Sequence, residues 1–217
     1  PQKELGRSDF SLPKDKNLYC CPQTLFKIHP DFDLALSKIV EKDDNSLIVM
    51  IETKHKLYVE KLKNRWLKNF PILNKKVIFL KSMQLEEFLS LIKISDVLLD
   101  PFYFGAGLSF AESMVIGTPT VTMPSKFMRS RVATGMYKQM KISNPPIAKN
   151  VDEYVDLAIE LAKNKKNNLK LRNVLKDAAK LYLFNDINAV KKFETFLIQA
   201  HESSKSGSFL KDGHIIT

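Results

Sequence analysis

The stretch that decides the fold spans residues 97–124 and reads VLLDPFYFGAGLSFAESMVIGTPTVTMP. Its first three residues are apolar and predict a short strand that is buried on both faces and ends at Asp100. Gly105 and Gly107 follow, and glycine permits a tight turn and a close approach of the backbone to another group. The stretch therefore begins as a strand that leads into a glycine turn.

A helix is expected directly after this turn. Gly117, with Pro119 just beyond it, predicts where the helix ends, and residues 120–123 predict the next strand. The N–H groups that open such a helix have no backbone partners and carry the positive end of the helix dipole. At the carboxyl edge of a parallel strand they form a place for a phosphate. The spacing alone leaves open a plain strand–helix turn whose glycines serve only packing.

The rest of the chain repeats this alternation of strands and helices. Apolar runs predict strands at 18–21, 46–51, 77–80, 97–99 and 120–123. Helical segments are expected between them, near 31–40 with Asp31 as the N-cap, at 55–69 and at 85–94. Such alternation predicts right-handed β-α-β units, and hence an α/β fold with a mostly parallel sheet and helices on both faces.

The chain divides into three predicted parts. Residues 1–145 form the α/β lobe, with a helix near 130–140, and Asn144-Pro145-Pro146 marks its end. Residues 146–203 are expected to form C-terminal helices near 151–164, 167–182 and 185–203 that pack on or beside the lobe. Residues 204–217 are predicted to be a polar tail with little to bury.

The composition indicates a globular protein without a membrane span. Of 217 residues, 44% are hydrophobic and 27% are charged, and neither a membrane-length apolar run nor a signal-peptide core is present. The only cysteines, Cys20 and Cys21, are adjacent, so a disulfide between them is not expected. We expect a cytoplasmic protein that acts without a membrane.

The charge is strongly basic, with a formal net charge of +10. A nucleic-acid partner is not expected, because the chain carries no helix-turn-helix signature, zinc pattern or aromatic RNA-binding motif. The lysines are spread along predicted helix faces, which indicates a solvated surface that also favours anionic ligands. The four histidines show no metal-ligand spacing, so no metal site is predicted.

Several residues near the carboxyl ends of the predicted strands can carry chemistry. The Ser109 hydroxyl can add a hydrogen bond to a phosphate at the helix start, and Glu112 can accept hydrogen bonds from a ribose. Lys27, in the loop after the first strand, can reach the same phosphate, or it is one surface lysine among many. Arg129 and Arg131, after the last strand, contact an anion or are solvated arginines. No general base can be named.

Six short runs together resemble a known family. They are LP at 12–13, YC at 19–20, LFKIHP at 25–30, DVLLDP at 96–101, GTPTVTMP at 117–124 and SRV at 130–132. In order and spacing, over roughly residues 8–200, they resemble the C-terminal catalytic lobe of O-linked N-acetylglucosamine transferases and SPINDLY-like proteins. These form glycosyltransferase family 41, and the resemblance is greatest to bacterial members with tetratricopeptide repeats.

This resemblance implies a GT-B fold with two Rossmann-like lobes, of which the C-terminal one binds the nucleotide. It implies transfer of a sugar, such as N-acetylglucosamine, from a UDP-sugar to a Ser or Thr hydroxyl of a protein or to another hydroxyl, with no required cofactor. Because the chain begins with Pro1 rather than Met, we expect a fragment that lacks the N-terminal lobe, binds the donor and does not turn it over. A non-catalytic nucleotide-binding or scaffold module of the same fold remains the alternative.

The resemblance also assigns roles to residues. Lys27 matches the lysine that contacts the diphosphate, Glu112 matches the acidic ribose-binding position, and the helix start at Gly107-Leu108-Ser109 matches the phosphate-binding segment. Lysine and helix dipole together would stabilise the departing UDP, the role that a metal has elsewhere. The wider set expected to bind the donor is Gln23, Thr24, Phe88, Gly105, Gly107, Leu108, Ser109, Glu112 and Arg131.

The chain departs from the family pattern at three of these places. Phe88 stands where animal members have a histidine near the uracil. Leu108 and its neighbours replace a His-Thr-Thr run that offers side-chain donors. Thr24 stands at the position of a family glutamine, with Gln23 beside it. Contact of the backbone with the nucleotide survives these changes, whereas they leave the sugar and the base undetermined.

Overall fold

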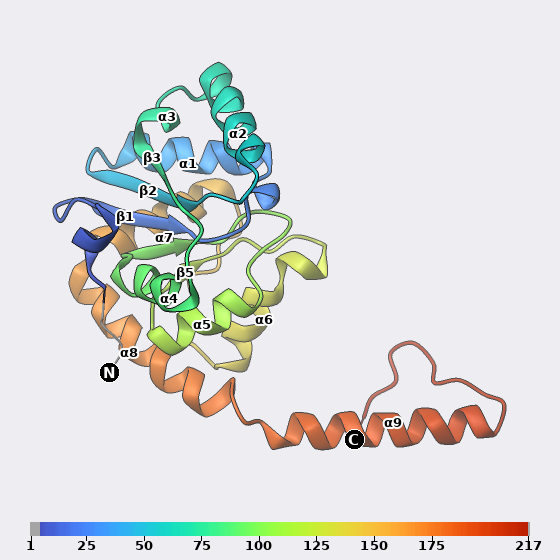
Figure 1. Cartoon of the computed structure of the whole chain (residues 1–217). Coiled ribbons are helices and arrows are strands. Elements are labelled where there is room, and N and C mark those ends of the chain that lie inside the picture. Colours follow the sequence, from blue (N-terminus) through green and yellow to red (C-terminus); the bar gives the residue numbers. More distant parts are fainter. Residues whose placement is uncertain (1–4, 217) are drawn as a thin grey trace.

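The computed structural model describes residues 5–216 and contains one parallel five-stranded sheet with helices on both faces (Figure 1). The strands are β1 (Asn17–Cys21), β2 (Ser46–Ile51), β3 (Val77–Leu80), β4 (Val97–Leu99) and β5 (Thr120–Val121). Their order across the sheet is β3-β2-β1-β4-β5, and every described pair is parallel. The predicted Rossmann-like α/β fold is confirmed.

Strand β1 lies at the centre of the sheet and pairs with strands that follow it at very different distances in the sequence. Tyr19 is in register with Ile48 of β2 on one side and with Val97 of β4 on the other. The strand order therefore reverses between β1 and β4. In open parallel sheets, ligands bind outside the carboxyl ends of the strands at such a reversal.

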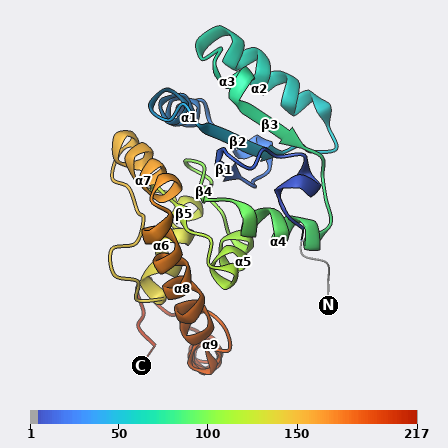
Figure 2. The same cartoon turned by 90° about the vertical axis from the view of Figure 1, so that its left-hand side faces the viewer.

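Helices lie on both faces of the sheet (Figure 2), and a hydrophobic cluster lies beneath them on each face. The helices α1 (Pro30–Lys42), α2 (Lys56–Asn69) and α7 (Val151–Lys163) contribute to the first, and α4 (Leu85–Ile94) contributes to the second. Because side chains alternate along a strand, Tyr19 and Cys21 belong to the first cluster while Leu18 and Cys20 belong to the second. The two cysteines are therefore buried on opposite sides of the sheet.

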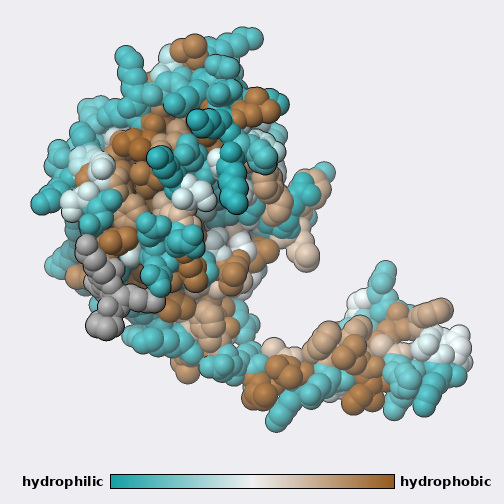
Figure 3. Space-filling view, in the orientation of Figure 1, coloured by the Kyte–Doolittle hydropathy of each residue, from teal (hydrophilic) through white to brown (hydrophobic). Residues whose placement is uncertain are grey.

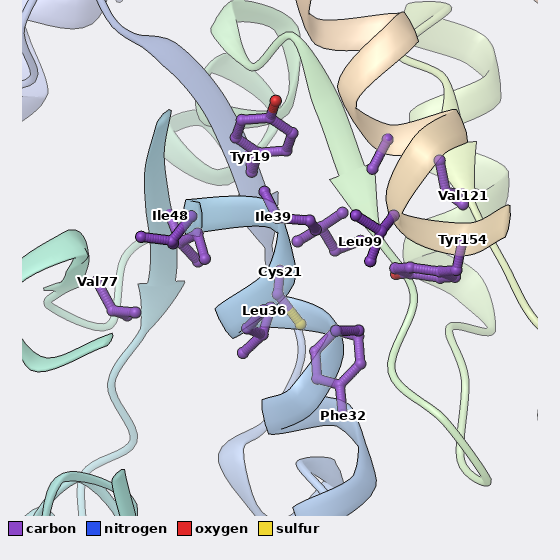
Figure 4. Packing of buried hydrophobic residues seen from close by; sticks show 14 of the residues in the cluster. Tyr19, Cys21, Phe32, Leu36, Ile39, Ile48, Val77, Leu99, Val121 and Tyr154 are labelled. Carbon is purple, nitrogen blue, oxygen red and sulfur yellow. The ribbon is translucent and has the colours of Figure 1, made fainter. Parts of the chain in front are cut away.

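Aromatic rings fill the first cluster near the carboxyl end of β4. Figure 4 shows Phe32 of α1 and Tyr154 of α7 in the layer of side chains that covers β1 and β4. Phe32 lies edge-on to Phe102, with ring centroids 5.1 Å apart, and Phe102 lies edge-on to Tyr154 at 5.2 Å. The loop after β4 is thereby anchored in the core at its first residues.

A third cluster joins α5 (Leu108–Ile116), α6 (Val132–Gln139) and α8 (Lys165–Tyr182). Phe110 and Tyr137 meet edge-on within it, with centroids 4.8 Å apart. Arg172 of α8 donates to the Thr118 hydroxyl at 3.0 Å and also to the carbonyl of Ser95, which links α8 to both ends of the unit formed by β4 and α5. The helix that begins at the glycine turn is therefore held from two sides.

Helix α9 (Ile187–Lys205) extends away from the rest of the chain (Figure 1), and none of its residues is buried. Apolar side chains gather along this arm in Figure 3, and Phe193, Phe196 and Leu197 are among its exposed residues. How the chain divides at residue 145 stays a prediction. Residues 1–4 and 217, which belong to the predicted lobe and tail, lie outside the described residues.

The structure differs from the sequence-based expectations in a few details. Strand β5 ends at Val121 rather than at residue 123, because Thr122 forms an isolated bridge with Ile147. The N-cap of α1 is His29 rather than Asp31, since the His29 Nδ1 accepts from the Asp31 N–H at 3.2 Å. The short helices not expected from the sequence are η1 (Arg7–Phe10), α3 (Leu73–Lys76) and η3 (Met128–Ser130).

Gly117 provides a test of how α5 is packed. Its φ of +88° is unfavourable for a side chain, and a Cβ there would lie 2.5 Å from the carbonyl oxygen of Arg172. We expect Gly117→Ala to lower the free energy of unfolding by about 2–4 kcal/mol in urea denaturation. Gly135→Ala in α6 is the control, because a Cβ there meets nothing within 4 Å. It should leave stability unchanged or raise it by up to about 1 kcal/mol, and equal effects of the two changes would refute this account.

Candidate functional site

The loops that follow β1 and β4 meet at the carboxyl edge of the sheet. The loop after β1 contributes Gln23 and Lys27, and the loop after β4 contributes the turn from Asp100 to Gly107. These loops lie side by side because β1 and β4 are adjacent in the sheet. The parallel pairing of two strands therefore brings together residues that are 78 positions apart in the sequence, Lys27 and Gly105.

A chain of hydrogen bonds connects the predicted site residues of the two loops. The Lys27 ammonium donates to Gln23 Oε1 at 2.8 Å and to the carbonyl oxygen of Gly105 at 3.1 Å. Gln23, which is only 6% exposed, donates from Nε2 to Ser109 Oγ at 2.7 Å. An ammonium has three N–H donors, so these two bonds orient Lys27 and leave it one donor for a ligand.

The charges at the site are partly buried and act on each other. Burial lowers the pKa of Lys27, and the nearby Asp100 carboxylate opposes this by favouring the charged ammonium. Burial also raises the pKa of Asp100 to about 6, against the effect of hydrogen bonds from Thr122 and Ala106 and of the Lys27 charge. The positive Lys27 ammonium thus lies closer to the surface than the negative Asp100 carboxylate, which is buried.

The glycine turn is shaped by the Asp100 carboxylate beneath it. Asp100 Oδ1 accepts from the Ala106 N–H at 2.6 Å, and its Oδ2 accepts from the Thr122 hydroxyl at 2.7 Å. A Cβ on Gly105 would lie 2.7 Å from the carboxylate, so only glycine permits this close approach. A Cβ on Gly107 would meet nothing within 4 Å. Packing therefore explains Gly105 and leaves open space at Gly107, the N-cap of α5.

Two hollows open beside this turn. One of about 290 Å³ lies at the ends of β1, β2 and β3 and brings together three predicted residues, Gln23, Thr24 and Phe88. The other, of about 280 Å³, contains Lys27 with Phe104 and Arg129. The Lys27 ammonium lies 4.5 Å from the centre of the Phe104 ring, and the Arg129 guanidinium lies 5.9 Å from it. Two cations therefore share one exposed aromatic ring, an arrangement that favours an anion nearby.

The remaining predicted residues are less closely tied to this arrangement. Leu108 is 75% exposed at the start of α5, and Glu112 lies one turn further along, partly buried. Among the described residues, no hydrogen bond or ion pair involves the Glu112 carboxylate or the exposed Arg131 guanidinium. Arg129, rather than Arg131, lines the hollow that contains Lys27, and its Nε donates to the carbonyl of Tyr103 at 2.9 Å.

The sequence-based candidates did not include Asp100 or Phe104, and Arg129 was named as an anion-contact candidate but not among the residues expected to bind the donor. Asp100 was interpreted only as the residue that ends a strand, although a carboxylate at the carboxyl end of a central parallel strand is a usable signal. Arg129 was considered together with Arg131, and nothing in the sequence distinguishes the two. Phe104 carried no signal, since its position over Lys27 depends on how the loop after β4 folds.

Residues 5–216 show neither a metal-binding cluster nor a membrane-spanning helix. Within these residues, no group of three or more histidine, cysteine, aspartate or glutamate side chains is close enough to hold a metal ion. No helix described there combines the length and the apolar character that crossing a bilayer requires.

Comparison with known proteins gives one family match. The model of Glycosyl transferase family 41 matches residues 4–193, which is most of the chain. A probable UDP-N-acetylglucosamine–peptide N-acetylglucosaminyltransferase SEC of Arabidopsis thaliana is 24% identical over 211 residues. That match covers 89% of this chain and 20% of the plant protein, so the chain spans about a fifth of its curated relative.

Solved structures share the fold. An O-GlcNAc transferase mutant of Thermobaculum terrenum matches with a TM-score of 0.70 and 19% identity, over 80% of this chain and 35% of that one. Anabaena Alr3699/HepE, solved in complex with UDP, matches with a TM-score of 0.65 and 12% identity, over 89% of this chain and 51% of that one. At these identities the likeness establishes the fold alone.

The buried Asp100 gives the protein a testable pH dependence. Its folded pKa of about 6 exceeds the value of about 3.9 expected in the unfolded chain, so the folded state binds more protons between these values. Protonation of Asp100 therefore makes the fold more stable by about 1.3 kcal/mol as pH falls from 7 to 5, and by at most about 3 kcal/mol over the whole titration. Asp100→Asn removes the stabilisation that comes from protonation of Asp100. The stability of this variant relative to the unchanged protein should therefore decline as pH falls.

Urea denaturation at several pH values measures this effect. Asp212→Asn is the control, because Asp212 is exposed in the C-terminal segment, and its curve of stability against pH should run parallel to that of the unchanged protein. A parallel curve for Asp100→Asn as well would show that Asp100 does not have the raised pKa.

Proposed function

This chain belongs to glycosyltransferase family 41, and we propose on that premise that it forms the donor-binding half of an enzyme that transfers a sugar from a UDP-sugar. The sugar is N-acetylglucosamine, and the acceptor is a Ser or Thr hydroxyl of a protein or another hydroxyl. The similarity to a probable plant UDP-N-acetylglucosamine–peptide N-acetylglucosaminyltransferase supports this choice. Because the chain spans only part of these proteins, it binds the donor without transferring the sugar by itself.

The observation that carries the proposal is the position of Lys27 beside the start of α5. Its ammonium is oriented by Gln23 and by the carbonyl of Gly105, and Ser109 lies next in the same chain of hydrogen bonds. A diphosphate in front of α5 would accept hydrogen bonds from the free N–H groups of the helix start and from the remaining N–H of Lys27. The helix dipole would stabilise its negative charge. These groups stabilise the negative charge that develops on UDP as the bond to the sugar breaks.

We propose that the residues around this point bind the other parts of the donor. The hollow lined by Gln23, Thr24 and Phe88 takes the base, and the Phe88 ring can stack on it without offering a hydrogen bond. The Glu112 carboxylate accepts from the ribose hydroxyls. Gly105, Gly107 and Leu108 contribute through their backbone. We further propose that the reaction uses no cofactor, and that the protein acts in the cytoplasm.

A non-catalytic nucleotide-binding or scaffold module is the alternative. Leu108, 75% exposed, occupies a helix start where side-chain donors would strengthen a catalytic site. Gln23, Lys27 and Ser109 are nevertheless joined in one connected network at the place where a phosphate would lie. A module that had lost nucleotide binding would be under no constraint to keep a partly buried lysine there, because an isolated buried charge is unfavourable. The network therefore favours nucleotide binding in either case.

Isothermal titration of the chain with UDP tests the proposal. Lys27→Ala should weaken binding by about 10- to 100-fold, because a charge-assisted hydrogen bond contributes about 1.5–3 kcal/mol. Lys192→Ala is the control, since this lysine is exposed on α9, which extends away from the site. Its affinity should equal that of the unchanged chain.

Two outcomes would contradict the proposal. If a folded chain shows no heat of binding with UDP, the donor-binding assignment fails. If Lys27→Ala and Lys192→Ala bind UDP equally well, then the nucleotide binds elsewhere and Lys27 has no role. A transfer assay separates the enzyme from the alternative. A longer protein that contains this chain should transfer a radiolabelled sugar to a peptide if it is an enzyme, and should not do so if it is a scaffold.

A further inference from the structure

Asp100 is the most completely buried charged residue beside the site, and its own backbone is fixed on both sides. Its N–H donates to the carbonyl of Val121 in β5 at 3.0 Å, and its carbonyl accepts from the Tyr154 hydroxyl of α7 at 3.0 Å. The side chain is only 2% exposed. The backbone of Asp100 is therefore anchored at the end of β4, and its buried carboxylate has little freedom to move.

One peptide group connects this carboxylate to Lys27. The peptide between Gly105 and Ala106 donates through the Ala106 N–H to Asp100 Oδ1 at 2.6 Å. The same peptide accepts through the Gly105 carbonyl from the Lys27 ammonium at 3.1 Å. The described chain contains no cis peptide, and in a trans peptide the N–H and C=O point in opposite directions. A single rigid plane thus has Asp100 on one side and Lys27 on the other.

The close contact at Gly105 and the bond to Thr122 fix this plane further. The Asp100 carboxylate lies so near to Gly105 that a Cβ could not fit, and its second oxygen accepts from the Thr122 hydroxyl at 2.7 Å. On the outer side, the Gly105 N–H donates to the carbonyl of Arg129 at 3.0 Å. The turn is therefore held from its own loop, through Asp100, and from the segment that follows β5, through Thr122 and the carbonyl of Arg129.

We propose that Asp100 is a positioning residue of the donor site, which orients the Gly105–Ala106 peptide so that Lys27 and the start of α5 face the same diphosphate. This inference rests on the proposed function and extends it to a residue that does not touch the donor. Asp100 acts through the peptide plane, because the carboxylate lies beneath the turn and Lys27 lies above it.

A role as a mere counter-charge predicts a different result. Asp100→Asn and Asp100→Ala both remove the negative charge, so an effect of charge, whether repulsion of the diphosphate or support of the charged Lys27 ammonium, should be the same in the two variants. A difference in affinity between them must therefore come from the hydrogen bond to Ala106. Asn keeps the oxygen that accepts this bond, and the Thr122 hydroxyl can turn to accept from its amide, whereas Ala provides no acceptor.

Binding of UDP-GlcNAc by calorimetry distinguishes these roles. We expect Asp100→Ala to weaken binding about tenfold or more, and Asp100→Asn to bind within about threefold of the unchanged chain or more tightly. The matched control is Asp43→Ala, because Asp43 is another buried carboxylate, which accepts from the Tyr19 hydroxyl at 2.8 Å near the start of β2. It should lower stability and leave the affinity for UDP-GlcNAc unchanged.

A measurement without any nucleotide makes the test independent of donor binding. Hydrogen exchange of the Ala106 amide, followed by NMR, should be at least about tenfold faster in Asp100→Ala than in Asp100→Asn. The signal of the Lys27 Cε methylene should move in Asp100→Ala and stay unchanged in Asp43→Ala. Both readouts report on the peptide plane itself.

Each outcome decides the matter. If Asp100→Asn and Asp100→Ala lose the same affinity, or if Ala106 exchanges at the same rate in both, Asp100 does not position the turn. If the unchanged chain does not bind UDP-GlcNAc, the proposed function fails, and the exchange of Ala106 and the Lys27 signal still decide whether Asp100 orients the peptide.

Discussion

The parallel pairing of β1 with β4 is the constraint on which the rest of the structure depends. Tyr19 and Cys20 are in register with Val97 and Leu98, although helices and two other strands separate these pairs in the sequence. The pairing sets the reversal of strand order, and it places the loop of Lys27 against the glycine turn. The hydrogen bonds between these loops, from Lys27 to the carbonyl of Gly105 and from Gln23 to Ser109, follow from this pairing.

The buried core and the polar site are parts of one arrangement. Phe102, in the loop after β4, packs between Phe32 and Tyr154, while Tyr154 also donates to the carbonyl of Asp100. Apolar packing thus fixes the loop close to the point where the carboxylate emerges. The position of the charged groups depends on aromatic rings of the buried core, which is the usual relation between a rigid scaffold and a site on its loops.

The sequence predicted the sheet well because its strands are short apolar runs, and a proline or an aspartate directly follows the predicted strands at 18–21, 97–99 and 120–123. The end of α5 at Gly117 was likewise predictable from the residues around it, and so was the position of Lys27 at the carboxyl edge of the sheet, whereas the role of Lys27 there stays a prediction. Strand β5 was expected to be longer, because nothing in residues 120–123 indicates that Thr122 pairs with Ile147 instead. The roles of Asp100 and Arg129 depend on contacts between distant loops, and a pattern of spacing does not contain them.

The start of α5 departs from the family pattern at Leu108, and this departure explains why the glycine turn before the helix must be rigid. Leu108 offers no hydrogen bond, and among the side chains at this helix start only the Ser109 hydroxyl can donate, while it already accepts from Gln23. A phosphate there must be held mainly by backbone N–H groups, whose directions are set entirely by the conformation of the turn. A turn with two glycines is intrinsically mobile. The buried Asp100 carboxylate, through its bond to the Ala106 N–H, supplies the order that the missing side-chain donors would otherwise have provided.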